Sequence, residues 1–396
     1  MVAPLRSAAG LLADRSVLPT SVRAAVGYYA DTGTVDVDSL RLQGTVDDRS
    51  EAMIESVFDP VEAAIADAFD APEVTFSYDT KLVLPAQLTL GHIYRKARAR
   101  APAGSDPVEL GPWADRGDRG PASFTDALAA VDWDSDPDPQ ELVDRAELFT
   151  RLVVEALIDG DMRDAVNDAE YEDFEVSIDL SEGERAEVAR LAQETLQAEL
   201  AGRFDAVPDG VIEAYDWAVE VSEAHQDRDE HFRALYERAR EGEADAATAI
   251  REEYRDAALE TETDVFDAET RSLPYLKTQY ARVGVIYDGM IEMYRAAGLP
   301  VDTAFKRSIV LSIIGAQIWL DDVDDYPADV ADGQLTPVTA EYVLADIDGA
   351  AYESVRSITD DYLDLAKRYA AESDAPLAGI AAEYIYRSGD PSVLPR

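Results

Sequence analysis

The sequence predicts an all-α protein: an antiparallel helical bundle preceded by an irregular N-terminal third. Two observations favour this fold class. From residue 141 onward, apolar residues recur almost without interruption at the three- and four-residue spacing of amphipathic helices, and turn signals such as "VPDG" and "AAGLP" separate the runs. Before residue 141, shorter helical patches alternate with joints rich in proline, glycine and aspartate.

We therefore expect two parts, an irregular and partly helical region over residues 1–140 and an all-α domain over residues 141–396. In the first part, residues 50–69 have a helical pattern, and residues 73–84 carry the β-branched and aromatic residues of a short strand. Residues 101–140 are the best candidate for a linker or long loop. The helices expected in the second part are 141–166, 184–203, 209–225, 228–260, 274–297, 303–326 and 338–385.

The charge balance excludes two classes of partner. The chain has 82 acidic and 35 basic residues, a formal net charge of -47, and only five of the basic residues are lysine. Nucleic acid and anionic membranes would both be repelled by such a surface. Acidic excess, scarce lysine and the absence of cysteine together predict a cytoplasmic protein of a salt-accumulating halophile of the archaeal type, without disulfides or thiolate chemistry.

No membrane segment is expected. The longest apolar run, residues 308–320, is shorter than the roughly 20 residues that a helix needs to cross a bilayer. The first residues lack the apolar core of a signal peptide. The three histidines, His92, His225 and His231, show no metal-ligand spacing, so we expect them to be structural.

An acidic motif, "GAQIWLDDVDDYPAD", follows this apolar run. Asp321, Asp322 and Asp325 form a DDxxD pattern, Asp329 follows one turn later, and Pro327 is expected to end or kink the helix just after residue 326. Carboxylates at the negative end of a helix dipole repel both the dipole and one another. A hard cation with oxygen ligands would relieve this repulsion, and Mg²⁺ completed by substrate phosphate oxygens suits the motif best.

These residues resemble a known family. "GAQIWLDDVDD" is similar to the second aspartate-rich motif of the trans-isoprenyl diphosphate synthases, which reads roughly FQxxDDxxD. "LKTQYA" is similar to the family's Lys-Thr motif, and its Lys277 precedes Asp321 by 44 residues. Squalene and phytoene synthases, of the same fold, also have a glutamine before this motif and a Gly…Pro element after it, where Gly333 and Pro337 stand here.

The resemblance implies the α-helical isoprenoid synthase fold and Mg²⁺-dependent chemistry on a prenyl diphosphate. It implies Asp321, Asp322, Asp325 and Asp329 as metal ligands. It also implies Lys277 as a diphosphate contact and Gln317 as a residue that orients ligands or water.

The chain departs from the family pattern in several places. The only candidate for the first aspartate-rich motif is "GDMRD" at residues 160–164, which leaves Asp161 and Asp164 as its metal ligands and has no arginine pair after it. Gln334 stands where the family has a lysine. A basic segment, "YRKARARAP", offers a second diphosphate contact through Arg95, Lys96 and Arg98, or else it is a helix end whose cations complement the dipole.

The function expected from the sequence is Mg²⁺-dependent prenyl transfer or cyclisation on an allylic prenyl diphosphate, a small-molecule substrate. The alternative is a non-catalytic helical scaffold or assembly protein, cellular or viral, in which the acid is salt adaptation only. A third reading keeps the fold but makes the chain a catalytically inactive relative, which Gly160 and Gln334 favour. The sequence leaves open whether the chain forms a homodimer.

Overall fold

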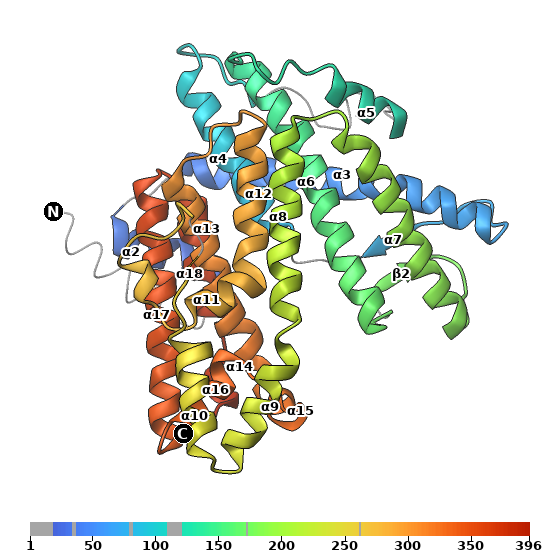
Figure 1. The fold of residues 1–396 in the computed structure, drawn as a ribbon. Coiled ribbons are helices and arrows are strands. Elements are labelled where there is room, and N and C mark those ends of the chain that lie inside the picture. Colours follow the sequence, from blue (N-terminus) through green and yellow to red (C-terminus); the bar gives the residue numbers. More distant parts are fainter. Residues whose placement is uncertain (1–18, 34–36, 79–81, 109–120, 172, 261–262) are drawn as a thin grey trace. The chain divides into compact units, whose positions relative to one another are not determined.

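The computed structural model describes residues 19–33, 37–78, 82–108, 121–171, 173–260 and 263–396. The described chain is mostly helical, which confirms the predicted all-α class (Figure 1). Its only strands there are β1 (Phe76–Tyr78) and β2 (Phe174–Val176), which pair antiparallel with Phe76 opposite Val176. The strand expected within residues 73–84 is therefore present and short. None of the described helices is long and apolar enough to cross a membrane.

The chain divides into two compact units. Within the described residues, the first unit contains residues up to 37, 215–289 and 302–396, and the second contains residues 38–214 and 290–301. Residues on both sides of position 140 belong to the second unit, so the compact units do not follow the expected boundary at that position. The acidic motif and "LKTQYA" both lie in the first unit.

The second unit is built around one long helix, α6 (Pro139–Asp168), which packs against α4 (Leu84–Arg100) and α7 (Glu182–Phe204). A capping box starts α6, because the Asp138 carboxylate accepts from the N–H of Glu141 while the Glu141 carboxylate accepts from the N–H of Asp138. The other helices that lie wholly or mainly in this unit are α3 (Val37–Ala68), α4 (Leu84–Arg100), α5 (Pro121–Ala129) and α7 (Glu182–Phe204).

Charged side chains run along the buried face of α6 at four-residue spacing. They are Glu147, Arg151, Glu155, Asp159 and Arg163, and all but Arg163 are buried. Each has a partner of opposite charge: Arg49 pairs with Glu147, Arg203 and Arg151 pair with Glu155, and Arg163 pairs with Asp159 at 2.6 Å. Charges that are buried in opposite pairs avoid most of the cost of an isolated buried charge.

The first unit holds most of the remaining helices. They are α2 (Thr20–Thr32), α9 (Asp229–Arg240), α10 (Ala244–Ala249), α11 (Leu276–Gln279), α13 (Thr303–Ala316), α14 (Asp322–Asp324), α15 (Tyr326–Asp332), α16 (Pro337–Leu344), α17 (Asp348–Glu372) and α18 (Pro376–Ser388). The unit boundaries fall inside two further helices, α8 (Asp209–Gln226) and α12 (Val285–Ala296). Two short 3₁₀ turns, η3 (Thr270–Ser272) and η6 (Pro391–Val393), complete the unit.

Three segments of the first unit are π-helical: η2 (Ile250–Arg255), η4 (Tyr280–Gly284) and η5 (Gln317–Asp321). The segment η4 joins α11 to α12, and η5 joins α13 to α14. Helices of this kind are rare and occur frequently at functional sites. The sequence pattern does not reveal them, because the same residues also fit an α-helix.

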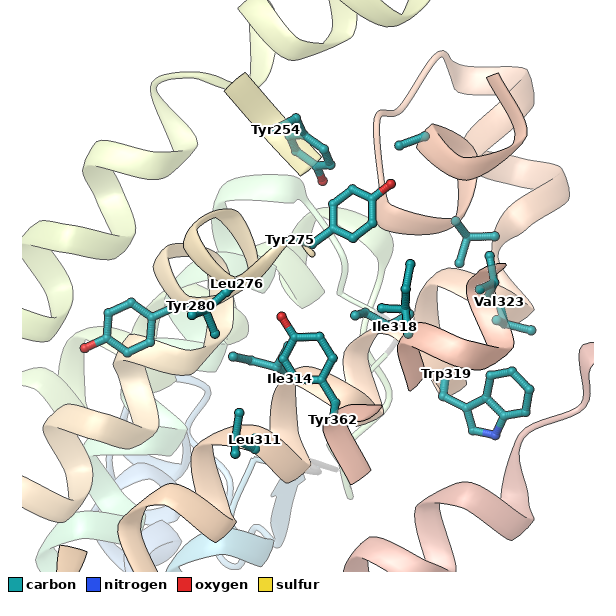
Figure 2. Close-up of a cluster of buried hydrophobic side chains, with 14 of the residues drawn as sticks. Tyr254, Tyr275, Leu276, Tyr280, Leu311, Ile314, Ile318, Trp319, Val323 and Tyr362 are labelled. Atoms are coloured by element: carbon teal, nitrogen blue, oxygen red, sulfur yellow. The ribbon is translucent and has the colours of Figure 1, made fainter. Parts of the chain in front are cut away.

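The core of the first unit forms where α13 packs against α17 and against η4. Gly315 allows this approach, because a Cβ there would lie 2.7 Å from Cδ2 of Leu363. Figure 2 shows the cluster, in which aliphatic side chains of α13 and the following turn lie among buried tyrosines. The buried tyrosine hydroxyls are hydrogen-bonded. Tyr254 donates to the carbonyl of Leu335 and Tyr362 donates to the carbonyl of Pro274, both at 2.8 Å.

The expected helix 303–326 is interrupted. α14 ends at Asp324, and α15 begins at Tyr326 with Pro327 in its first turn, where the missing N–H of proline is tolerated. The break therefore falls at Asp325, two residues before the proline, and the chain resumes as a helix afterwards. As a result, the acidic motif spans the junction of two short helices.

Candidate functional site

The acidic motif brings four aspartates together at the end of α13, but they differ in exposure. Asp322 is buried, with 1% of its surface exposed. Asp321 and Asp325 are exposed, and Asp329 is half-buried. Two backbone hydrogen bonds link the turns that carry them, from the N–H of Asp325 to the carbonyl of Asp321 and from the N–H of Asp329 to the carbonyl of Asp325, both at 2.9 Å. Asp321, Asp325 and Asp329 therefore lie on successive turns.

The π-helical register of η5 places Gln317 beside two of these carboxylates. The Gln317 amide donates to Oδ2 of Asp321 and to Oδ1 of Asp322, the latter at 3.4 Å. These residues are four and five positions after Gln317. In an α-helix only the first would lie on the same face, whereas i→i+5 hydrogen bonding brings the fifth residue round as well. Gln317 thus holds Asp321 and Asp322 side by side.

Arg282 is the cation of this site. Its Nη1 donates to Oδ1 of Asp322 at 3.3 Å, and it comes from η4, the π-helical segment that follows Lys277. Burial of the guanidinium opposes its charge, but Asp322 and the other nearby acids outweigh burial and raise the pKa of Arg282. The guanidinium is therefore charged at neutral pH.

The ion pair with Arg282 offsets only part of the cost of burying the Asp322 carboxylate. Burial raises the pKa of its carboxyl to about 7; Arg282 and the Gln317 hydrogen bond lower the pKa, whereas Asp321 and Asp329 raise it further. Its second oxygen, Oδ2, is buried and has no hydrogen-bond partner in the described chain. A buried carboxylate oxygen without a partner costs free energy, so this atom adds to the cost of keeping Asp322 ionised.

The pKa values of two neighbouring aspartates are raised as well. Burial raises the pKa of Asp329 to about 6; Arg282 opposes that rise and Asp325 adds to it. The pKa of Asp325 is also raised, by burial and then by Asp321 one turn earlier. The repulsion expected between Asp321 and Asp325 is therefore present, and it extends to Asp329.

Arg282 also lowers the pKa of two further residues, His225 and Asp229, which were not predicted as part of the site. Burial lowers the pKa of His225 to about 4, and Arg282 and Arg228 lower it further, so its imidazole is neutral near pH 7. Burial raises the pKa of Asp229, against Arg282, which lowers it. No spacing rule in the sequence links these residues to the motif. For Arg282, its position five residues after Lys277 on a continuous helical run was the only available signal.

The other predicted residues are distributed over both units. Lys277 lies on α11, half-buried and without an ion pair to any residue that the structure describes. Arg95, Lys96 and Arg98 lie on α4 of the second unit, where Arg98 pairs with Asp106 at 2.7 Å. Those three side chains therefore belong to the second unit, whereas the aspartates of the acidic motif belong to the first.

The proposed first motif also lies in the second unit. Asp161 and Asp164 lie on α6, which continues through Gly160 without a break. Asp161 accepts a hydrogen bond from Tyr78, whose pKa is raised first by burial and then by Asp161. Asp164 is exposed on the following turn.

A preformed chelate of three ligands is absent from the described residues, which contain no group of three or more histidine, cysteine, aspartate or glutamate side chains arranged to hold a metal ion. Mg²⁺ does not require one, because it is commonly held by one or two carboxylates together with water and substrate phosphates. Asp321 and Asp322, held together by Gln317, fit this mode, and the free Oδ2 of Asp322 offers a lone pair for it.

Comparison with known proteins adds no assignment: no family model, no curated protein and no solved structure matches the chain.

Proposed function

We propose that the first unit binds an allylic prenyl diphosphate through Mg²⁺ at the acidic motif and catalyses its transfer or cyclisation, on an isoprenoid-synthase-type antiparallel bundle. One observation carries this proposal. Asp322 is buried beside Asp321 at the end of an apolar helix, it faces Arg282, and one of its oxygens has no partner. A site that binds both a cation and an anion explains why the chain keeps carboxylates and a guanidinium there.

The metal ligands in this proposal are Asp321 and Asp322, with Asp325 and Asp329 on the following turns. When bound, Mg²⁺ would supply charge stabilisation to the leaving diphosphate. Gln317 holds the first two carboxylates in position, so little ordering is left for the moment of binding.

The cations in this proposal are Arg282 and Lys277, which offset the remaining charge of the diphosphate. Lys277 has no competing ion pair in the described chain and is free to make this contact. In this proposal the Arg282 guanidinium contacts both Asp322 and the diphosphate. A guanidinium offers several N–H donors in a fixed plane and suits diphosphate oxygens better than a point charge does.

Apolar side chains also lie on the turns that carry Asp322. Ile318 and Val323 are buried on the same turns, and Tyr254 and Trp319 lie in the same core cluster (Figure 2). A carbocation formed by loss of diphosphate reacts with any water that reaches it, so side chains of this kind protect the intermediate by excluding water.

The competing candidate is the non-catalytic scaffold. It is favoured by one feature, the Arg282–Asp322 pair itself, which compensates a buried charge within the chain and can be purely structural. In that case Asp321, Asp325 and Asp329 are solvated acids at a helix end, and Lys277 is an ordinary surface lysine.

Calorimetric titration separates the two. Geranyl diphosphate with Mg²⁺ is titrated into the full chain in molar KCl, and then into Asp322→Asn, Lys277→Ala and the matched control Asp324→Asn. Asp324 lies two residues from Asp322 on α14 but is exposed. We expect binding to the wild type and the control, no binding to Asp322→Asn, and a loss of about 1.5–3 kcal/mol for Lys277→Ala, as for a charged hydrogen bond. Identical isotherms for all four proteins, or no binding to the wild type, would leave the scaffold as the function.

A further inference from the structure

The π-helical segment η4, which carries Arg282, begins at a buried tyrosine that is tied to the helix after it. This residue is Tyr280, and its hydroxyl donates to Oδ2 of Asp288 at 2.5 Å. Asp288 lies on α12 and is fully buried. Burial and then Asp288 raise the pKa of Tyr280, so its hydroxyl stays protonated at neutral pH and can donate. The hydrogen bond therefore spans η4 and joins its first residue to the following helix.

The π-helical turn is what brings these two residues to one face. They are 8 positions apart in the chain. In a continuous α-helix, where each residue turns the chain by about 100°, that spacing would place them about 80° from each other around the axis. A π-helical turn contains one extra residue, which reduces the offset to about 20°. The hydrogen bond between Tyr280 and Asp288 therefore fits the π-helical turn and would not fit an uninterrupted α-helix.

The acceptor, Asp288, is itself held in place. Lys306 on α13 is buried and pairs with Asp288, and it also pairs with Asp264 at 2.8 Å. The hydroxyl of Thr263 donates at 3.1 Å to the same carboxylate oxygen that accepts from Tyr280. Because these partners come from different segments of the first unit, Asp288 cannot move toward or away from η4 without breaking an ion pair that is buried from water.

The register of η4 sets the direction of the two cations assigned to the diphosphate. Arg282 lies within this turn, and Lys277 lies on α11 immediately before it. A change of the turn to the α-helical register would rotate the residues before it by about 100° relative to α12. Arg282 reaches Asp322 at 3.3 Å, already at the long end of the range for a hydrogen bond. A rotation of the turn that carries Arg282 would therefore separate the two groups.

We propose that Tyr280 and Asp288 are positioning residues of the acidic motif, because their hydrogen bond keeps η4 π-helical. Through this register they direct Arg282 at Asp322 and at the diphosphate. The part of the inference that concerns the diphosphate rests on the proposed function, whereas the direction of Arg282 toward Asp322 is a property of the chain alone. The other side of the pair is held in a similar way, since Gln317 in η5 contacts Asp322.

The test uses Tyr280→Phe, which removes the hydroxyl and keeps the ring. The matched control is Tyr369→Phe. Tyr369 is also buried and also donates to a carboxylate of the first unit, that of Asp267, but it lies on α17 and Asp267 lies outside η4. The two variants therefore lose the same kind of hydrogen bond, and only the first loses the one that spans η4. Circular dichroism of each variant confirms that the helices remain folded.

The first measurement needs no ligand. A double-mutant cycle of Arg282→Gln and Asp322→Asn, by urea unfolding at pH 8 in molar KCl, gives the coupling energy between these two side chains. The cycle is measured in the wild type, in Tyr280→Phe and in Tyr369→Phe. We expect the coupling energy to fall by at least half in Tyr280→Phe and to stay the same in Tyr369→Phe, although both variants lose stability. An unchanged coupling energy in Tyr280→Phe would overturn the proposal, because a purely structural tyrosine changes stability alone.

The second measurement is calorimetric titration of geranyl diphosphate with Mg²⁺ into the wild type, Tyr280→Phe and Tyr369→Phe. We expect Tyr280→Phe to bind at least threefold more weakly than the wild type and Tyr369→Phe to match the wild type. Equal affinity of Tyr280→Phe and the wild type would overturn the role of Tyr280 toward the ligand. No binding to any of the three would contradict the proposed function instead, and the coupling energies would then decide whether Tyr280 positions Arg282.

Discussion

Arg282 donates a hydrogen bond to Asp322 over 3.3 Å and so joins the middle of one π-helical segment to the residue that follows another. The two residues are 40 positions apart. The pair matters because Asp322 is the buried member of the acidic motif, and Arg282 is the only cation within ion-pair distance of it in the described chain. The stability of this junction therefore depends on the charge state of both groups.

The first prediction concerns pH. The pKa of Asp322 is about 7 in the folded chain and 3.8 when unperturbed, so the folded state binds more protons between these values. This group alone therefore lowers the free energy of unfolding by about 1.4 kcal/mol per unit as pH rises from about 4 to 7, and by no more above pH 7. His225 acts in the opposite direction, because its folded pKa of about 4 lies below the unperturbed 6.5.

Asp322→Asn isolates the aspartate from these opposing effects. Without Mg²⁺, we expect the variant to gain stability relative to the wild type as pH rises from 4 to 7, with a constant difference above that range. Thermal unfolding of both proteins at fixed molar KCl measures this difference, with Asp324→Asn as the control that follows the wild type. A difference that does not change with pH would show that folding does not raise the pKa of Asp322.

The second prediction concerns Arg282→Gln. At pH 8 this change leaves the Asp322 carboxylate buried without its cation, and the loss of a charged hydrogen bond costs about 1.5–3 kcal/mol of unfolding free energy. Adding Asp322→Asn to it should recover most of that loss, because an amide needs no cation. The measurement is a double-mutant cycle by thermal unfolding. Strictly additive effects of the two changes would contradict the pairing, and Arg233→Gln, at an exposed position on α9, serves as the control.

Most helices could be predicted from the sequence, because a buried helix face leaves a spacing of three and four residues that neighbouring elements do not alter. The expected run 209–225 matches α8 (Asp209–Gln226) to within one residue. The break inside 303–326 was predicted only approximately. Pro327 signals a helix end, but its tolerance of the first turn of a helix lets the chain start α15 around it.

The site was less accessible to sequence reasoning. Asp321 and Asp322 were found because they are adjacent in the chain, whereas Arg282 reaches Asp322 only through folding. The π-helical register of η5, which turns Asp322 toward Gln317, depends on tertiary packing and has no sequence signature. The compact units were equally hidden, because each is assembled from segments that are far apart in the chain.

The third prediction tests the buried charges of the second unit. Glu155 receives Arg203 and also Arg151, and the side chains of Glu155 and Arg203 are fully buried. Glu155→Gln removes the negative charge and should cost about 3–5 kcal/mol, because the two guanidinium groups remain buried with a neutral amide. Glu199→Gln is the matched control: Glu199 pairs with Arg203 at 3.0 Å but is 31% exposed, and we expect a loss of about 1 kcal/mol or less. Urea unfolding in molar KCl measures both, and equal losses would contradict the role given to burial.

The last prediction concerns salt. With 82 acidic and 35 basic residues, the folded chain concentrates negative charge that unfolding would spread out. Lowering KCl from about 1 M to about 0.1 M lengthens the screening distance from roughly 3 Å to 10 Å, so acids on neighbouring turns begin to repel one another. We expect the melting temperature to fall steadily over this range. The same series in Asp325→Asn should show a slightly weaker dependence, because one of the repelling groups beside Asp321 is gone. A melting temperature that does not change between the two salt concentrations would mean that the acidic surface is not an adaptation to salt.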